Sequence, residues 1–373
     1  MFPPHFQAVK LLVLAQTPPP VHGQSVMVHT LVRGLPAHGV ELRHVNLRLS
    51  RDQADIGRWR WGKLAVVLDA CLHAIADRFA HGCDTLYYVP APAKRGALYR
   101  DWMVMLLCRP FFRRLVLHWH AAGLGEWLRA RASAPERALT RLLLGRADLA
   151  IVLGEGLRED AAALAPRRIA VVPNGIADPC PGFARAVPAA GRAPTALFLG
   201  LGIPEKGMLD AIAGAEAAGW RIVVAGDIPD PARAAALHRQ AAASGGRLVL
   251  AGFIRGEEKH RRLAEADALV FPTYYPAETQ GLVVAEALAH DLPVVVTRWR
   301  AVAENLPPAH VKVVPPRDPA AVAAALRAIA REEPPAGASR RHFLAHLTLE
   351  RHLAGLAGAI GGLDRPAPDR GSS

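Results

Sequence analysis

The sequence predicts an α/β fold with two parallel β-sheets, each flanked by helices. Short runs rich in β-branched residues and leucine alternate with Ala- and Leu-rich segments of helical period along the 373 residues. Each half of the chain holds six such runs, and residues 179–195, between the halves, are rich in Pro and Gly and follow neither period. A chain of this length suits two domains of roughly 150–200 residues.

The expected strands are separated by helical segments or turns, as in doubly wound domains. In the first half they are Lys10–Ala15, Val40–Asn46, Thr85–Tyr88, Leu115–His118, Leu149–Leu153 and Ile169–Val172. In the second half they are Ala196–Gly200, Arg221–Ala225, Leu248–Leu250, Ala268–Phe271, Pro293–Thr297 and Val311–Val314. We therefore predict Rossmann-like domains over 1–178 and 196–340, joined by a linker over 179–195. A helix over 341–363 and a disordered tail over 364–373 follow.

Charge and cysteine content limit the functional class. The net charge is +12, and residues 1–178 carry 23 Lys and Arg against 14 Asp and Glu. This surplus predicts an anionic partner, and an arginine-rich coding bias is the alternative explanation. The cysteines, at positions 71, 83, 108 and 180, form no C-x-x-C pair, so we expect free thiols and no zinc site. Without a signal-peptide pattern or a long apolar run, the expected location is the cytoplasm.

Residues that follow the strands of the first half are candidates for ligand binding, because ligands bind beyond the carboxyl ends of parallel strands. Gly23 precedes the first helix and lets the backbone approach an anion at the helix N-terminus, although an ordinary strand-to-helix turn explains it equally well. His120 follows the fourth strand and is predicted to hydrogen-bond a ligand hydroxyl. His118 is expected to be buried in the strand.

The second half contains two stronger signals. Gly202 and Lys206 lie in Gly-Leu-Gly-Ile-Pro-Glu-Lys-Gly, directly after the first strand, and this loop suits a diphosphate. Its spacing matches neither the ATPase loop nor a full dinucleotide fingerprint. Glu278 and Glu286 lie eight residues apart on either side of Gly281, at the start of a helix. Both carboxylates can reach one elongated ligand, and the neighbouring aromatic residues argue against a solvent-exposed pair.

Three segments together resemble a known family. They are Val172-Pro173-Asn174-Gly175-Ile176, Pro204-Glu205-Lys206-Gly207 and the Glu278…Glu286 pair. The chain resembles, over nearly its whole length, the retaining glycosyltransferases of family 4, also called glycosyl transferases group 1. The resemblance implies the GT-B fold, in which two Rossmann-like domains face each other across a cleft and a C-terminal helix crosses back to the first domain. It also implies a hexosyltransferase-like enzyme with a nucleotide-sugar donor.

The resemblance assigns roles to individual residues. Lys206 is expected to contact the donor diphosphate, Glu278 the donor sugar, and Glu286 the ribose hydroxyls. The backbone near Phe253 and Ile254 is expected to meet the base, and Gly281 and Leu282 to offer amides to the donor. His120 is expected to reach the transferring sugar, so that His120, Lys206 and Glu278 form the catalytic set.

The sequence departs from the family pattern at two positions. Leu201 stands where relatives often have Arg, and Arg300-Ala301 stands where they often have Gly-Gly. Arg300 is therefore the candidate for the second cation on the diphosphate. The sequence contains no D-x-D motif, and Asp227 and Asp230 have the wrong spacing. We expect a reaction without a metal ion or other cofactor.

Basic and aromatic residues are interleaved in two segments of the first domain, Arg58–Lys63 and Trp102–Arg114. This composition suits an anionic membrane interface. It predicts a polyprenyl-diphosphate-linked glycan as acceptor, in bacterial surface-polysaccharide biosynthesis at the inner face of the cytoplasmic membrane. The alternative for Trp102–Cys108 is a helix of the domain core.

Rival functions come from other classes. A non-catalytic nucleic-acid-binding protein would explain the charge but not the glutamate pair, and no nucleic-acid motif is recognised, so no nucleic-acid partner is expected. A GT-B-fold sugar-nucleotide epimerase would keep the donor site without an acceptor. A catalytically silent relative would be consistent with Leu201.

Overall fold

The computed structural model describes residues 9–48, 61–185, 191–332 and 336–364. The chain forms two compact units: the N-terminal unit extends to Asn174 and includes the chain from His352 onward, and the C-terminal unit is Gly175–Arg351. Each unit contains one six-stranded sheet, and every strand pairing is parallel. The predicted α/β fold with two parallel sheets is confirmed.

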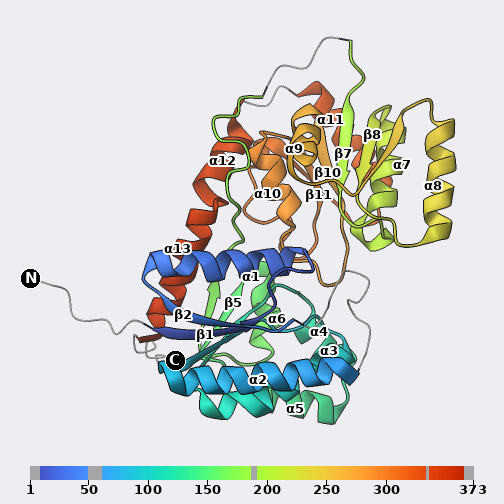
Figure 1. Cartoon of the computed structure of the whole chain (residues 1–373). Coiled ribbons are helices and arrows are strands. Elements are labelled where there is room, and N and C mark those ends of the chain that lie inside the picture. The colour runs from blue at the N-terminus through green and yellow to red at the C-terminus, as the bar shows by residue number, and fades with distance from the viewer. Residues whose placement is uncertain (1–8, 49–60, 186–190, 333–335, 365–373) are drawn as a thin grey trace, which may run out of the picture. The chain divides into compact units, whose positions relative to one another are not determined.

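The sheet of the N-terminal unit has the order β2-β1-β3-β4-β5-β6. Its strands are β1 (Lys10–Ala15), β2 (Glu41–Asn46), β3 (Thr85–Tyr88), β4 (Arg114–His118), β5 (Leu149–Val152) and β6 (Ile169–Val171). Its helices are α1 (Gly23–Gly34), α2 (Trp61–His81), α3 (Arg95–Cys108), α4 (Leu124–Ala130), α5 (Ala134–Leu144) and α6 (Arg158–Ala162). Helices α1 and α2 lie on opposite faces of the sheet (Figure 1). This coverage explains why β3 and β5 are buried along their whole length.

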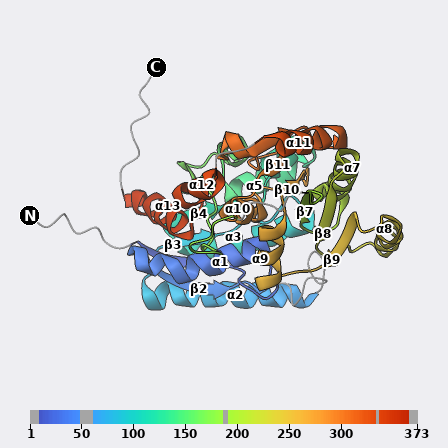
Figure 2. The same cartoon turned by 90° about the horizontal axis from the view of Figure 1, so that it is seen from above.

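The sheet of the C-terminal unit has the order β12-β11-β10-β7-β8-β9. Its strands are β7 (Thr195–Leu199), β8 (Arg221–Ala225), β9 (Leu248–Gly252), β10 (Ala268–Phe271), β11 (Val294–Thr297) and β12 (Val311–Val314). Its helices are α7 (Met208–Ala218), α8 (Pro231–Ala243), α9 (Gly256–Glu265), α10 (Leu282–Ala289), α11 (Pro319–Arg331) and α12 (Ala338–His346). Helix α8 lies at the β9 edge of the sheet (Figure 2). The order reverses between β10 and β7, the place where doubly wound sheets bind ligands.

The twelve predicted strands are all present, with ends within two residues of the prediction. Short 3-10 turns complete the described elements, at Leu35–His38, Arg109–Phe111, Glu155–Leu157, Pro204–Lys206, Pro308–His310 and Gly362–Asp364. Among the described residues, no helix is both long and apolar enough to cross a bilayer.

The single helix predicted over 341–363 is two helices, α12 and α13 (Leu349–Gly361). The break lies at Leu347–Thr348, where the backbone pairs with Ile176. The Ile176 amide donates to the Leu347 carbonyl at 3.0 Å, and the Leu349 amide donates to the Ile176 carbonyl at 2.8 Å. These bonds replace helical ones and end α12. The amphipathic period alone could not reveal the break, because the partner strand segment is far away in the sequence.

The end of the chain packs within the N-terminal unit. Leu353 covers Gly34 so closely that a Cβ added to Gly34 would lie 2.3 Å from a Leu353 methyl group. The ring nitrogen Nδ1 of His352 lies 2.7 Å from the Pro173 carbonyl, and Arg168 donates to the Gly362 carbonyl at 3.0 Å. Leu356 and Ile360 are fully buried. Helix α13 therefore supplies part of the core of the N-terminal unit.

Candidate functional site

Two loops meet where the strand order of the C-terminal sheet reverses, one after β7 and one after β10. The Tyr274 amide donates to the Glu205 carbonyl at 2.7 Å, and the Thr273 hydroxyl donates to the same carbonyl at 3.3 Å. Thr297, at the end of β11, donates its hydroxyl to the Thr273 carbonyl. These bonds fix the backbone of the two loops against each other. The side chains that they carry are therefore held in place before any ligand binds.

Glycine is required at two positions because the loops pack closely. Gly207 has φ 78°, and an added Cβ would lie 2.2 Å from the Pro272 carbonyl oxygen. Gly281 has φ 75°, and an added Cβ would lie 2.7 Å from the Phe271 ring. Side chains larger than hydrogen would push the loops apart. The two glycines immediately precede α7 and α10, which have no side-chain cap, so their first amides remain available to a ligand.

Gly202 has a structural role that the sequence did not predict. Its amide donates to the Asp227 carbonyl at 2.7 Å, and an added Cβ would lie 2.6 Å from the Ile228 side chain. The glycine lets the loop after β7 approach the loop after β8. Its own amide is therefore already bonded within the chain.

Lys206 and Glu278 form a close ion pair between the two loops. Lys206 Nζ lies 2.6 Å from Glu278 Oε2, and the two side chains are 20% and 10% exposed. The Thr273 hydroxyl lies 3.2 Å from the same carboxylate oxygen and shares its single proton between this oxygen and the Glu205 carbonyl. Lys206 Nζ also lies 4.9 Å from the centre of the Tyr275 ring. The ammonium group has three protons, so it can hold Glu278 and still donate to a ligand.

Glu286 has a lysine partner that the sequence analysis missed. Lys259 Nζ, on α9, lies 2.6 Å from Glu286 Oε1. The other carboxylate oxygen, Oε2, is buried and has no hydrogen-bond partner among the described residues. An unsatisfied buried acceptor is costly, and a ligand hydroxyl would satisfy it. In the sequence, Lys259 is distinguished only by its position, a few residues after the predicted base-binding segment at Phe253 and Ile254.

Other predicted residues of the C-terminal unit lie in the segments after β9, β10 and β11, and Leu201 follows β7. Phe253, which follows β9, is 56% exposed, and Leu201 is 41% exposed. The guanidinium carbon of Arg300 lies 5.3 Å from the centre of the Trp299 ring. Trp299 in turn donates its indole N–H to the Tyr275 carbonyl at 2.9 Å, which ties the Arg300 segment to the loop that carries Glu278. Ile254 and Leu282 are half-buried at their predicted places.

Gly23 lies at the first position of α1, whose N-terminus is already capped. The Ser25 amide donates to His22 Nδ1 at 3.3 Å, and the His22 amide donates to the Ser25 hydroxyl at 3.1 Å. This capping box satisfies the His22 and Ser25 amides, whereas the sequence analysis expected amides at this helix end to bind an anion. Such a box normally has an acidic or amide side chain at its third position, which is why His22 and Ser25 were not recognised.

His120 belongs to a histidine cluster in the N-terminal unit. Its ring centre lies 4.1 Å from that of His118, which is buried, as predicted, and hydrogen-bonded to the Tyr87 hydroxyl. The ring centre of His352, on α13, lies 6.3 Å from the ring centre of His118. Burial lowers the pKa of His120 to about 3 and that of His352 to about 4, and it places the pKa of His118 well below 6.5. All three rings are neutral at pH 7, so each can both donate and accept a hydrogen bond.

These neutral histidines predict an acid-sensitive N-terminal unit. Between pH 6.5 and about pH 4, His352 is protonated in the unfolded chain but not in the folded one. Its contribution to stability is therefore present above pH 6.5 and is lost as the pH falls, by about 1.4 kcal/mol per pH unit. In urea unfolding over this range, His352→Gln should show a pH slope shallower by about this amount. Replacement of the exposed His238 should leave the slope unchanged, and equal slopes in both variants would contradict the assignment.

The structure thus places the predicted residues in two groups. Gly23 and His120 lie in the N-terminal unit, and the others lie in the C-terminal unit. Lys206 and Glu278 are in direct contact, whereas Glu286 pairs separately with Lys259. Across the described part of the chain, no group of three or more His, Cys, Asp or Glu side chains is arranged to hold a metal ion.

Comparison with known proteins finds a family match in the C-terminal half of the chain. Residues 193–332 match the family model of the glycosyl transferases group 1. No curated protein matches the chain. The match to the family model includes both loops of the site and both of its ion pairs.

Solved structures of glycosyltransferase enzymes share the fold of the whole chain. Sucrose-phosphate synthase from Thermosynechococcus elongatus has a TM-score of 0.71 at 18% identity, covering 94% of this chain and 98% of that one. HepE from Anabaena, solved in complex with UDP, has a TM-score of 0.67 at 16% identity, covering 95% and 100%. A glycosyltransferase from Rickettsia africae has a TM-score of 0.72 at 11% identity, covering 96% and 99%. The two units have the GT-B fold.

Proposed function

We propose that this chain, a glycosyltransferase with a group 1 domain over residues 193–332, moves a sugar from a nucleotide diphosphate to an acceptor. The proposed reaction needs no metal ion. The observation that carries the proposal is the Lys206–Glu278 pair at the strand-order reversal of the C-terminal sheet. A cation held in a largely buried site is suited to a leaving group that gains negative charge. Anabaena HepE was solved with UDP and with UDP-glucose, which supports a nucleotide-sugar donor here.

The reaction requires stabilisation of two developing charges. The donor sugar passes through an oxocarbenium-like state, and the departing diphosphate becomes more negative. We assign Lys206 and the first amides of α7 and α10 to binding the diphosphate. Arg300 is the second cation, because this chain has Leu201 where relatives often have an arginine. Glu278 orients Lys206 and contacts the donor sugar, and His120 contacts the transferring sugar. Retention of configuration, with attack assisted by the leaving phosphate, completes the proposal.

The ribose assignment gives a direct test of donor binding. Glu286→Ala should weaken nucleotide binding about tenfold or more, because it removes a charged acceptor for the ribose hydroxyls. The measurement is a thermal-shift screen of UDP, GDP and ADP sugars, followed by titration of the nucleotide that stabilises the protein. The exposed Glu257 on α9 provides the matched control, since Glu257→Ala removes the same charge outside the site. Equal nucleotide affinity in the two variants would rule out the ribose role.

The helices α2, α3 and α5 support contact with an anionic membrane. They expose large apolar side chains: Leu68, Leu72 and Phe79 on α2, Leu106 on α3, and Leu139 and Leu142 on α5. The three residues on α2 are spaced to share one face of the helix. Helix α3 contributes to both the core and the surface, because Val104 and Met105 are buried whereas Leu106 is 64% exposed. We therefore propose an acceptor at the inner face of the cytoplasmic membrane, of the lipid-linked glycan type.

Basic residues near these helices should strengthen vesicle binding. Arg113 is exposed, Arg114 is half-buried at the start of β4, and Arg58 and Arg60 lie outside the described residues. Neutralising the four arginines should weaken binding to vesicles rich in anionic lipid, because each basic residue near such a surface contributes about 1 kcal/mol. Vesicle sedimentation measures the change, with the exposed Arg331→Gln as control. If the fourfold variant sediments like the control, these arginines are ordinary surface charges.

A further inference from the structure

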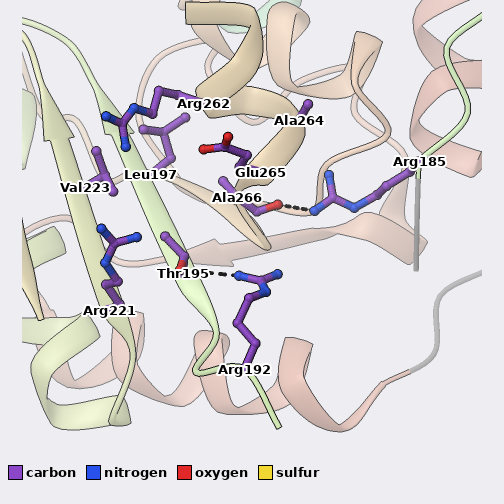
Figure 3. A pocket seen from close by; sticks show the side chains of 10 residues that line it. All are labelled: Arg185, Arg192, Thr195, Leu197, Arg221, Val223, Arg262, Ala264, Glu265 and Ala266. Carbon is purple, nitrogen blue, oxygen red and sulfur yellow. Dashed lines mark hydrogen bonds between the residues drawn. The ribbon is translucent and has the colours of Figure 1, made fainter. Parts of the chain in front are cut away.

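A pocket of about 330 Å³ opens in the C-terminal unit at the amino ends of the strands. Thr195 and Arg221, which begin β7 and β8, line it together with the end of α9 (Figure 3). The Lys206 loop follows the opposite end of β7. At about 3.3 Å per residue, this strand alone separates the two places by about 13 Å. The pocket is therefore distinct from the proposed donor site.

Four arginines line this pocket, against one carboxylate. Arg221 and Arg262 lie on one side of it and Arg185 and Arg192 on the other, with Glu265 between them (Figure 3). Glu258 and Asp267 pair with Arg262 and Arg192, whereas the bonds of Arg185 and Arg221 go to backbone carbonyls, so positive charge remains in the pocket for an anion to compensate. The volume is within the range of small-molecule sites.

Contacts within the chain hold these arginines in place. Arg221 donates its Nε–H to the Gly246 carbonyl at 3.3 Å. Arg262 donates its Nε–H to Glu258 Oε1 at 2.8 Å, and Arg192 donates to Asp267 Oδ1 at 2.6 Å. The bonds of Arg221 and Arg262 are made through Nε, so they orient each guanidinium group while its terminal nitrogens can still bind a ligand. Arg192 instead uses its terminal nitrogens, one toward Asp267 and the other toward the Thr195 hydroxyl at 3.5 Å. The pocket therefore has preorganised donors rather than loose surface side chains.

Arg185 provides an independent indication of a ligand. One terminal nitrogen donates to the Ala266 carbonyl, whereas the other, Nη1, is buried and has no hydrogen-bond partner among the described residues. Burial lowers the pKa of this guanidinium, and Asp267 opposes that effect. The Asp267 carboxylate already accepts bonds from Arg192 and from the Thr195 amide. A buried donor without a partner is costly, and an anion in the pocket would remove that cost.

We propose that this pocket binds a small molecule that carries a phosphate or diphosphate group. A carboxylate is flat and is held by one or two guanidinium groups. A phosphate group presents oxygens in several directions, which suits arginines that converge from two sides of a hollow. The multiple negative charges of a phosphate also match the charge of the lining. This ligand is separate from the proposed nucleotide-sugar donor.

The test is a calorimetric titration of pyrophosphate into the full-length Lys206→Ala protein, which lacks one of the two cations assigned to the proposed donor site. We expect binding at one site. Adding Arg221→Gln should weaken it about tenfold, the effect of losing a charged hydrogen bond. Among the described residues, the Arg221 side chain bonds only to the Gly246 carbonyl, so this variant should fold. Adding Glu265→Gln should instead strengthen binding about threefold, because a like charge leaves the pocket.

The exposed Arg239 on α8 supplies the control for overall charge, since Arg239→Gln removes one positive charge outside the pocket. It should leave pyrophosphate affinity nearly unchanged. The proposal is overturned if the Lys206→Ala protein binds no pyrophosphate, or if Arg221→Gln and Arg239→Gln have equal effects. Weaker pyrophosphate binding after Arg221→Gln, together with unchanged sugar-nucleotide binding when Arg221→Gln is made in the protein that keeps Lys206, would support the pocket independently of the donor site.

Discussion

Replacing Lys206 with alanine is expected to slow sugar transfer by two or more orders of magnitude. The ammonium group is held 2.6 Å from Glu278 and is only 20% exposed in its side chain, so it acts in a site largely shielded from water. Removing one preorganised donor from such a site costs about 10²–10³ in rate. Initial rates with donor and acceptor at saturation measure the effect on the chemical step.

A second lysine with an equally short ion pair serves as the control. Lys312 Nζ lies 2.6 Å from Glu332, outside the loops of the site, so Lys312→Ala should leave the rate nearly unchanged. The metal-free assignment is checked in the same assay, in which EDTA should have no effect. Loss of activity with EDTA and its restoration by magnesium or manganese would overturn that assignment. A Lys206→Ala protein as fast as the Lys312→Ala control would remove Lys206 from the reaction.

Replacing Glu278 with glutamine is expected to reduce transfer by about a hundredfold or more while nucleotide affinity stays the same or increases. Glutamine keeps the shape of the side chain but removes the charge that holds Lys206. Under the proposed role of Lys206, Glu278 and the diphosphate compete for the same ammonium group. Losing that competitor should favour binding of the free nucleotide even as the reaction fails.

Two measurements separate the possible roles of Glu278. Turnover reports its contribution to transfer, and titration with the free nucleoside diphosphate reports its effect on Lys206. Unchanged turnover would place Glu278 outside the site. Parallel loss of nucleotide affinity and turnover would show that Glu278 supports binding rather than transfer. A folding defect is identified independently by the melting temperature without ligand.

The sequence was sufficient to predict the strands and to place Lys206 and Glu278 in loops that follow two of them, for a physical reason. Strands buried on both faces are short, nearly continuous apolar runs, and β7 and β10 both have this character. Lys206 and Glu278 follow two strands that turn out to be neighbours, so their loops meet. These apolar runs, and the charged residues that follow them, can be recognised in the sequence without knowledge of the long-range contacts.

Other parts of the site depend on contacts between distant segments. The partners Lys259 and Glu286 are 27 residues apart, and no recognised sequence motif contains both of them. His352 reaches the Pro173 carbonyl across 179 residues. Local periodicity carries no information about such pairs, and the same holds for the break between α12 and α13 at Ile176.

The packing of α13 has a consequence for the order in which the chain folds as it is synthesised. The C-terminal unit is one continuous segment, Gly175–Arg351, whereas the N-terminal unit needs residues from both sides of it. Leu353, Leu356 and Ile360 fill the core of a unit whose first strand begins at Lys10. Although domains nearest the start of a chain usually fold first, the core of this unit is complete only after α13 has been synthesised. On the ribosome, the later half of the message therefore completes its domain before the earlier half does.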